Sequence, residues 1–321
     1  MRARPPLLPL LLAFLAGCPA PEAPAAATAV MSAPADGSPA AAPATSAAPA
    51  PSATAREMEK PYPCGELSCR DFPSAARALT VILEETKPAL VGFGESHALK
   101  GTEGVKSTTA RFTDELIPLF KDRASALVLE LWAPDPKCSK EKVKAVEQKQ
   151  KVVTEKQAAG NQNEFVKLGE KSRAEGIVPF LLKPTCEDFD KIRGAGDDAV
   201  MVMLDVVTRN MRDKTTALFA ETEKKAPGKM VLAYGGALHN DIVPREGREA
   251  WSYAADLDRL APGRYIEVDL VVPEFIKDTD TWRSLPWYAS YERGRADDRV
   301  VVIAVSARAF VVVFAPSAAP P

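Results

Sequence analysis

The chain has 321 residues, of which 41 are Lys or Arg and 43 are Asp or Glu, so its formal net charge is only -2. This balance gives no basic field, and nucleic acid is therefore excluded as an expected partner. After residue 15 no apolar run reaches the length of a membrane-spanning helix, so we expect no transmembrane segment.

Residues 1–17 have the pattern of a cleaved lipoprotein signal peptide. Arg2 and Arg4 precede the apolar run Leu7–Leu15, which is too short to remain in a bilayer as a permanent helix. The run ends in Leu-Ala-Gly-Cys18, which resembles the bacterial lipobox. That resemblance implies a lipid on the Cys18 thiol, whereas the alternative is an ordinary signal peptide with an unrelated cysteine.

Residues 18–57 are predicted to be the lipidated cysteine and a disordered tether, because Ala, Pro, Ser and Thr dominate and form no core. One α/β domain is expected over 58–315, followed by a disordered tail over 316–321.

From the signal peptide and the lipobox we expect the protein to be exported and held by its lipid on the periplasmic side of the cell envelope. Pro19 provides no acidic retention signal, which favours the outer membrane. Oligomeric state is left open.

Within the domain, short apolar runs alternate with longer amphipathic stretches, as in a sheet covered by helices. Strands are expected over 89–93, 126–131, 177–182, 230–234, 265–271, 300–305 and 310–314. Helices are expected near 73–86, 104–120, 138–173, 197–224 and 247–260. The predicted fold is a mostly parallel sheet flanked by helices, in which the last two strands form an antiparallel hairpin at one edge.

The segment 137–175 is rich in Lys, Glu and Gln, with few apolar residues. We interpret it as a solvated helical arm, and the alternative is a lid over a functional site.

Four cysteines remain after Cys18, an even number that suits an oxidising compartment. We expect Cys64 to pair with Cys69 across a tight loop. Cys138 and Cys186 follow two successive strands at similar distances, and we expect them to form the second disulfide. A cysteine metal site is the alternative, although no Cys-x-x-Cys pair is present.

The only two histidines each close a Gly-x-x-His motif directly after a predicted strand. These are Gly94-Glu95-Ser96-His97 and Gly236-Ala237-Leu238-His239. Parallel strands present their carboxyl ends at one edge of a sheet, where ligands bind in open α/β folds. We therefore expect the two imidazoles at one edge, and the alternative is that both are satisfied loop residues.

Further ionisable residues fall at the same level of the sheet. Glu130 closes an apolar strand, where a carboxylate has to be paired, hydrogen-bonded or bound to metal. Glu103 follows the first motif, and Arg212 with Asp213 lies in the helix before the second histidine strand.

Two chemistries remain open for these residues. His97, His239, Glu95 and Glu130 could hold a divalent metal (Mn, Zn, Fe or Co) that activates water. Alternatively, without metal, His97 acts as general base, Glu95 or Glu130 orients its ring and Arg212 stabilises the oxyanion. A third interpretation, with Ser96 as nucleophile and His239 as base, lacks the second glycine of a nucleophile elbow.

These motifs, together with Asn210-Met211-Arg212-Asp213 and the Asn240 that follows His239, resemble the superfamily that joins erythromycin esterases, ChaN haem-binding lipoproteins and the TraB/Tiki proteins. The resemblance covers roughly residues 85–270. It implies an α/β domain with a site built from Glu95, His97, Glu130, Arg212 and His239. It also implies hydrolysis of an ester or peptide bond in a small molecule or peptide. The ChaN-like alternative is binding and uptake of haem through an axial histidine, and a non-catalytic domain is the third possibility.

Overall fold

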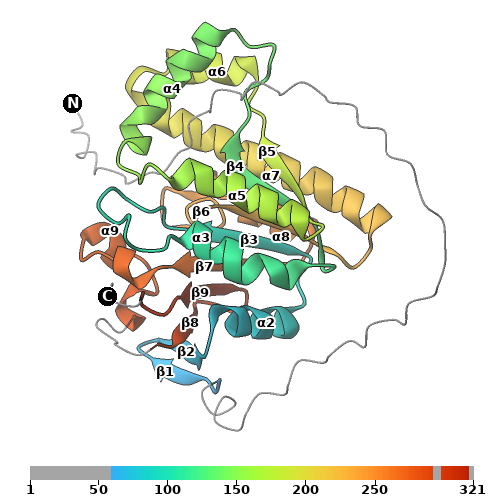
Figure 1. The fold of residues 1–321 in the computed structure, drawn as a ribbon, viewed down its shortest axis with the longest axis vertical. Coiled ribbons are helices and arrows are strands. Elements are labelled where there is room, and N and C mark those ends of the chain that lie inside the picture. Colours follow the sequence, from blue (N-terminus) through green and yellow to red (C-terminus); the bar gives the residue numbers. More distant parts are fainter. Residues whose placement is uncertain (1–58, 292–297, 318–321) are drawn as a thin grey trace, which may run out of the picture.

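The structure is a computed structural model that describes residues 59–291 and 298–317 (Figure 1). The expected signal peptide, Cys18 and tether lie outside the described residues, as does most of the expected tail. Ser317, which belongs to that tail, is described, and its hydroxyl accepts a hydrogen bond from Arg111 at 2.8 Å.

A nine-stranded sheet forms the centre of the molecule, in the order β1-β2-β8-β9-β7-β3-β6-β4-β5. The strands are β1 (Tyr62–Cys64), β2 (Leu67–Phe72), β3 (Leu90–Glu95), β4 (Ala124–Trp132), β5 (Val178–Leu182), β6 (Met230–Gly236), β7 (Tyr265–Val271), β8 (Val300–Ala304) and β9 (Ala309–Val313). Every pair from β9 through β7, β3, β6 and β4 to β5 is parallel. The α/β fold with a mostly parallel sheet is therefore confirmed.

The C-terminal hairpin is also confirmed, because β8 and β9 pair antiparallel. Its inner strand β9 joins the parallel part of the sheet at β7, and its outer strand β8 pairs antiparallel with β2. The β1–β2 hairpin extends this antiparallel side by two strands that the sequence pattern did not indicate.

Helices cover both faces of the sheet (Figure 1). The longer ones are α2 (Ala75–Thr86), α4 (Lys140–Thr154), α5 (Asn161–Ala174), α6 (Cys186–Gly194), α7 (Ala199–Lys225) and α8 (Ala254–Leu260). On one face, α2 and α5 share a core with the side chains of Phe93 and Tyr234. On the other, α4, α6, α7 and α8 pack on the opposite side chains of the same strands, such as Leu90 and Val231.

Three of the predicted helices are interrupted, and one of them, 247–260, is a 3₁₀ turn over Glu249–Trp251 followed by α8 from Ala254. The stretch 104–120 begins as α3 (Thr108–Arg111), continues as a π turn and ends as a 3₁₀ turn that contains Pro118. Proline has no backbone N–H, so it cannot continue an α-helix. The stretch 138–173 divides into α4 and α5 at residues 155–160.

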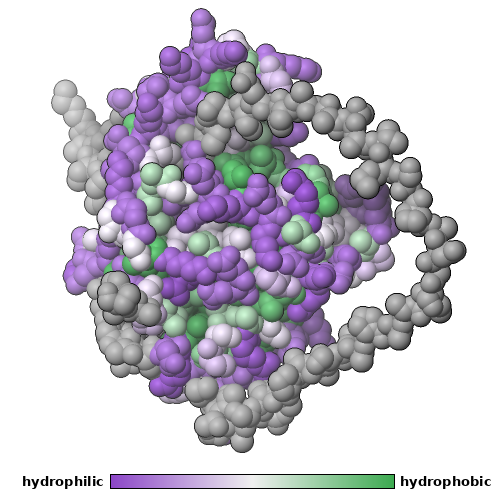
Figure 2. Space-filling model, viewed as in Figure 1, coloured by the Kyte–Doolittle hydropathy of each residue, from purple (hydrophilic) through white to green (hydrophobic). Residues whose placement is uncertain are grey.

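Both expected disulfides are present. Cys64–Cys69 closes the β1–β2 hairpin, and Cys138–Cys186 joins the segment before α4 to the first residue of α6. Within the described ranges, none of the helices combines the length and apolar character needed to cross a bilayer. The α4 end of the molecule, at the top of Figure 2, is mostly hydrophilic on the visible face, as its Lys and Glu content predicts.

Candidate functional site

Glu95 and His97 form a buried hydrogen-bonded pair at the carboxyl end of β3. Glu95 is the last residue of this fully buried strand, and its Oε1 accepts a hydrogen bond from Nδ1 of His97. Its other oxygen accepts from the Thr109 hydroxyl at 2.6 Å and from the Tyr234 hydroxyl at 2.5 Å. The Glu95 carboxylate is thus fixed from three directions, and it fixes the orientation of the His97 ring.

An aromatic cluster surrounds this pair. The Phe112 ring stacks on Tyr234 with centroids 4.5 Å apart, and Phe165 of α5 lies 6.2 Å from the His97 ring. Burial and the neighbouring Glu95 charge raise the pKa of Tyr234 well above its usual value. Tyr234 therefore stays protonated and remains a hydrogen-bond donor to Glu95.

Glu130 lies at the carboxyl end of β4, against the two glycines that end β6. A Cβ on Gly235 would lie 2.3 Å from Oε2 of Glu130, so the missing side chain provides the space for this carboxyl group. The Gly236 N–H donates to the same oxygen at 2.7 Å. Burial raises the pKa of Glu130 to about 7, although nearby His97 and the Gly236 hydrogen bond oppose the shift.

His239 is held in the turn after β6 by contacts to its Nδ1 atom. The Trp251 carbonyl oxygen lies 2.8 Å from Nδ1 and the Thr208 hydroxyl of α7 lies 2.9 Å from it. Because a carbonyl only accepts, Nδ1 carries the proton and Nε2 is the basic nitrogen. Nε2 lies 3.9 Å from Oε1 of Glu130. Burial lowers the pKa of His239 to about 4.

The two Glu–His pairs, Glu95–His97 and Glu130–His239, meet at Gly236. The position that a Cβ of Gly236 would take is 3.6 Å from Nε2 of His97 and 3.7 Å from Oε2 of Glu130. A charge on His97 also lowers the pKa of His239, so the two imidazoles interact electrostatically. Four predicted site residues are therefore brought together at one edge of the sheet.

The other predicted residues lie apart from this group. Arg212 is directed toward the protein surface, where it bonds Asp213 at 2.8 Å and Asp256 of α8 at 3.5 Å. Its expected role as an oxyanion stabiliser has no support in these contacts. Glu103 is exposed and accepts a hydrogen bond from the Gly101 N–H within its own turn, at 2.8 Å. The Asn240 side chain, fully buried, donates to Asp269 at 3.1 Å.

The expected metal ligands are close to one another but do not form a compact set. Within the described part of the chain, one group of three or more His, Cys, Asp or Glu residues has ligand atoms that all lie within 4.8 Å of one another, and it is Asp241, Glu267 and Asp269. These three carboxylates could hold a metal ion. Binding of a metal by His97, His239, Glu95 and Glu130 stays a prediction.

Glu267 and Asp269 of this acidic triad alternate along β7 with Val268 and Leu270 of the other face, so they lie on the α7 and α8 side of the sheet, as Glu130 does. Burial and repulsion from Asp269 raise the pKa of Asp241 to about 8, and burial raises that of Asp269 to about 7. Glu267 accepts a hydrogen bond from the Ile242 N–H at 2.6 Å. Gly94 of β3 leaves the space next to Asp269, because a Cβ there would lie 2.2 Å from Oδ1.

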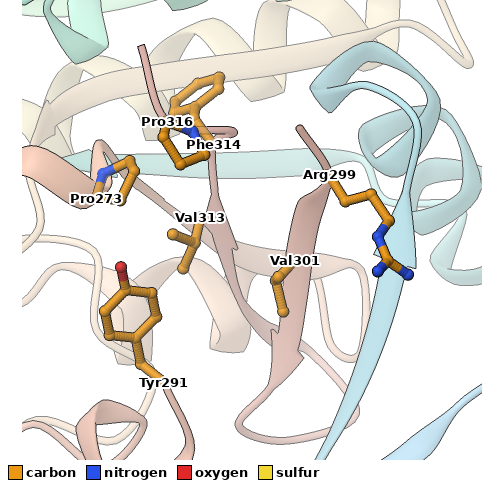
Figure 3. Close-up of a pocket in the computed structure, with 7 residues that line it drawn as sticks. All are labelled: Pro273, Tyr291, Arg299, Val301, Val313, Phe314 and Pro316. Atoms are coloured by element: carbon orange, nitrogen blue, oxygen red, sulfur yellow. The ribbon is translucent and has the colours of Figure 1, made fainter. Parts of the chain in front are cut away.

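The Glu–His pairs are closed off from solvent. Their exposed fractions are 4% for Glu95, 7% for His97, 1% for Glu130 and 3% for His239. The cavity in Figure 3, of about 20 Å³, lies between Val301 of β8 and Val313 of β9, away from these residues. A larger cavity of about 320 Å³ is lined by Leu99 and Lys100, just after His97 in the chain.

The α4–α5 segment provides part of this closure. Its connection pairs with the loop after His97, where the Ala158 N–H and the Asn161 side chain both donate to the Ala98 carbonyl, at 2.9 and 3.0 Å. Lys100 N–H donates to the Lys156 carbonyl at 3.1 Å. The segment expected to be a solvated arm is therefore also packed over the site loop.

Several residues of this site are not indicated by the sequence pattern. Thr109, Tyr234 and Thr208 hold the predicted residues, but each lies in an element whose packing direction the sequence alone does not give. The acidic triad could have been found from the sequence, because Glu267 and Asp269 interrupt an apolar strand as Glu130 does.

No protein-family model, curated protein or solved structure matches this chain.

Proposed function

We propose that this chain is a hydrolase that cleaves an ester or peptide bond by acid–base catalysis at the two Glu–His pairs. The observation that carries the proposal is the buried Glu95 carboxylate, which Thr109 and Tyr234 fix while it binds Nδ1 of His97. A carboxylate that orients a histidine in this way is the arrangement by which enzymes prepare a general base.

His97 is the general base in this proposal. Because Nδ1 donates its proton to Glu95, Nε2 is the nitrogen whose lone pair accepts a proton from water. It lies 3.6 Å from the position that a Cβ of Gly236 would take, and in this proposal the water molecule and the substrate carbonyl group meet there. The Glu95 charge stabilises the imidazolium that forms.

Glu130 is the general acid. With a pKa of about 7, a large share of this carboxyl group is protonated near neutral pH. His239 is neutral there, since its pKa is about 4, and its basic Nε2 faces Oε1 of Glu130. Two groups near each other with pKa values shifted in different ways are typical of an acid–base pair.

The proposed reaction balances with these two groups. Water loses a proton to Nε2 of His97 and its oxygen attacks the carbonyl carbon of the substrate. The bond from that carbon to the leaving oxygen or nitrogen breaks, and Glu130 donates its proton to the leaving atom. A proton then returns from His97 to Glu130, which restores both residues.

The metal-assisted version of the hydrolase uses the same residues. His97, His239, Glu95 and Glu130 would hold Mn, Zn, Fe or Co, which lowers the pKa of bound water. The proposed setting is that of an exported lipoprotein, with Cys18 lipidated and the domain reaching a small-molecule or peptide substrate from the cell-envelope membrane. The resemblance to erythromycin esterases and the TraB/Tiki proteins supports this class of reaction.

The test is hydrolysis of a panel of nitrophenyl esters and short peptides by the purified full-length protein. We expect His97→Gln to lower kcat/KM by about 10²- to 10⁴-fold, as loss of a general base does. Glu95→Gln should have a similar effect. In the wild type, activity should decline as pH rises through about 7, because Glu130 loses the proton it donates.

Ser96→Ala is the matched control, because Ser96 lies between the two residues of the first pair. Retained activity in this variant supports attack by water, and lost activity would indicate a serine nucleophile. Elemental analysis of the active protein separates the two versions of the mechanism. A wild-type protein inactive on the whole panel, with a Soret shift on adding haem, would contradict the hydrolase and favour the ChaN-like alternative.

A further inference from the structure

The cavity of about 320 Å³ next to the site loop is a basic pocket. It is lined by Leu99, Lys100, Glu155, Lys156 and Lys277, and we call it the lysine pocket. Three lysines and one glutamate belong to its lining, so its formal charge is positive although the whole chain is slightly acidic. Its volume lies in the range of sites that bind small molecules.

The three lysines come from three separate segments. Lys100 follows His97 in the loop after β3, Lys156 belongs to the α4–α5 connection, and Lys277 lies between β7 and α9 (Asp280–Arg283). These segments meet at the left of the view in Figure 1. Such a convergence is more specific than a run of lysines along one exposed helix, since distant parts of the chain must fold to make it.

Backbone contacts fix two of these segments side by side. The Lys100 N–H donates to the Lys156 carbonyl at 3.1 Å, and Leu99 forms a β-bridge with Gln157. In the part of the chain that the structure describes, none of the three lysines has an acidic group within 4.0 Å. No carboxylate in this part of the chain therefore pairs with them at contact distance, although backbone hydrogen bonds and, to a lesser degree, the Lys100 charge lower the pKa of Glu103.

The pocket also lies where the loop 98–100 meets the α4–α5 connection, and we call this boundary, which covers the Glu–His pairs, the seam. Leu99 and Lys100 of the loop form one wall of the pocket, and Glu155 and Lys156 of the connection form another. A molecule that reaches His97 by parting this seam would pass the three lysines first. Lysine is a flexible, strongly charged donor that suits phosphate and carboxylate groups.

We infer that the lysine pocket binds the carboxylate or phosphate group of a small anionic molecule. On the proposed function, on which this second step rests, that molecule is the substrate, and the enzyme prefers acidic esters or peptides over neutral ones. The lysine pocket then holds the acidic group while the bond to be cleaved lies at Gly236.

The direct test uses inorganic phosphate and succinate as probes and calorimetric titration of the full-length protein at low salt. We expect one or both probes to bind, and the triple variant Lys100→Gln, Lys156→Gln, Lys277→Gln to bind at least about tenfold more weakly, since exposed charge pairs contribute modestly and add over three sites. Whichever probe binds more tightly identifies the preferred anionic group. Equal binding by the triple variant and the wild type would overturn the inference.

Lys144→Gln is the control, because Lys144 is an exposed lysine of α4 that does not line the pocket. It should leave probe binding unchanged. In the activity assay, the triple variant should raise KM about tenfold for an ester with a free carboxylate and leave KM for its methyl ester and kcat for both unchanged. An unchanged KM for the acidic ester would overturn the substrate role.

The two proposals fail differently. If the wild type cleaves no ester or peptide but still binds phosphate or succinate through the three lysines, the hydrolase is wrong and the anion site stands. If activity is present and neither probe binds, the anion site is wrong and the hydrolase stands.

Discussion

Two adjacent glycine residues at the end of β6 leave space for different groups. A side chain on Gly235 would collide with Glu130, whose Oε2 and Cβ would lie 2.3 and 2.9 Å from the new Cβ. A side chain on Gly236 would make only ordinary van der Waals contacts, at 3.6 and 3.7 Å. Gly235 therefore makes room for the Glu130 carboxyl group, and Gly236 keeps open the space between His97 and Glu130.

We predict that Gly235→Ala lowers the free energy of unfolding by about 1–3 kcal/mol, the usual cost of overpacking a buried site. Gly236→Ala should change it by less than about 1 kcal/mol. It should nevertheless lower kcat at least about tenfold, because its methyl group occupies the reaction space. Denaturant titration and steady-state kinetics measure both effects. Full activity of Gly236→Ala would place the reaction elsewhere.

Four of the predicted site residues follow from the sequence pattern, and Arg212 does not. Glu95, His97, Glu130 and His239 could be found because each ends or directly follows an apolar strand, and parallel strands bring such positions to one edge. Arg212 could not be placed in this way. A helix turns its side chains through all directions, so adjacency to a histidine strand does not determine whether a helical residue points inward or, as here, toward Asp256.

At the scale of elements, the break between α4 and α5 is what brings the arm onto the site loop. The composition of 138–173 indicated helix throughout, since Lys, Glu and Gln favour helices and nothing but Gly160 marks an interruption. The break exists because the connection makes tertiary hydrogen bonds to Ala98 and Lys100 instead of helical ones. Local propensity contains no information about such partners.

We predict that Asn161→Ala loosens this seam. Asn161 is buried and its side chain donates to the Ala98 carbonyl at 3.0 Å, and such a bond contributes about 1 kcal/mol. The N–H groups of Lys100 and Ala158, which donate across the seam, should then exchange with deuterium about fivefold faster, as measured by mass spectrometry of peptides. Asn163→Ala, an exposed asparagine two residues along, is the control that should leave exchange unchanged. Equal exchange in both variants would show that Asn161 does not hold the arm.

For the whole molecule, the fold was predictable because the alternation of apolar strands and amphipathic helices extends over most of the domain, although it did not indicate the β1–β2 hairpin or α6. The mostly parallel sheet and the C-terminal hairpin follow that pattern, while the positions of the cysteines indicated both disulfides. The order of strands was not predictable. It places β3, with the first histidine motif, between β6 and β7, and this position brings the acidic triad next to the Glu–His pairs.

The acidic triad makes the stability of the whole domain dependent on pH. Folding raises the pKa of Asp241 to about 8 and that of Asp269 to about 7, from a usual value of 3.8. Between about pH 4 and pH 8 the folded state therefore binds more protons than the unfolded state. The stability that these groups contribute is complete below about pH 4 and is lost as pH rises toward 8.

We predict that Asp269→Asn, which has no charge at any pH, gains Tm relative to the wild type as pH rises from 5 to 8.5. Each kcal/mol of burial cost and repulsion that the substitution removes raises Tm by about 2–4 °C in a domain of this size. The exposed Asp114→Asn serves as the control and should show no such trend. If the triad holds a cation, millimolar Mg²⁺ or Ca²⁺ at pH 8 should raise the Tm of the wild type but not of Asp269→Asn. A constant Tm difference across pH would contradict the pKa shifts.

The two outermost strands of the sheet have a consequence for association between molecules. β1 has only three residues and is cross-linked to β2 by Cys64–Cys69, while β5 contains Pro179, which lacks a backbone donor. Short or proline-containing border strands offer few unsatisfied backbone groups to a neighbouring chain. If the proposed lipid anchor concentrates many copies on one membrane surface, we expect these edge strands to limit strand-to-strand association between the copies.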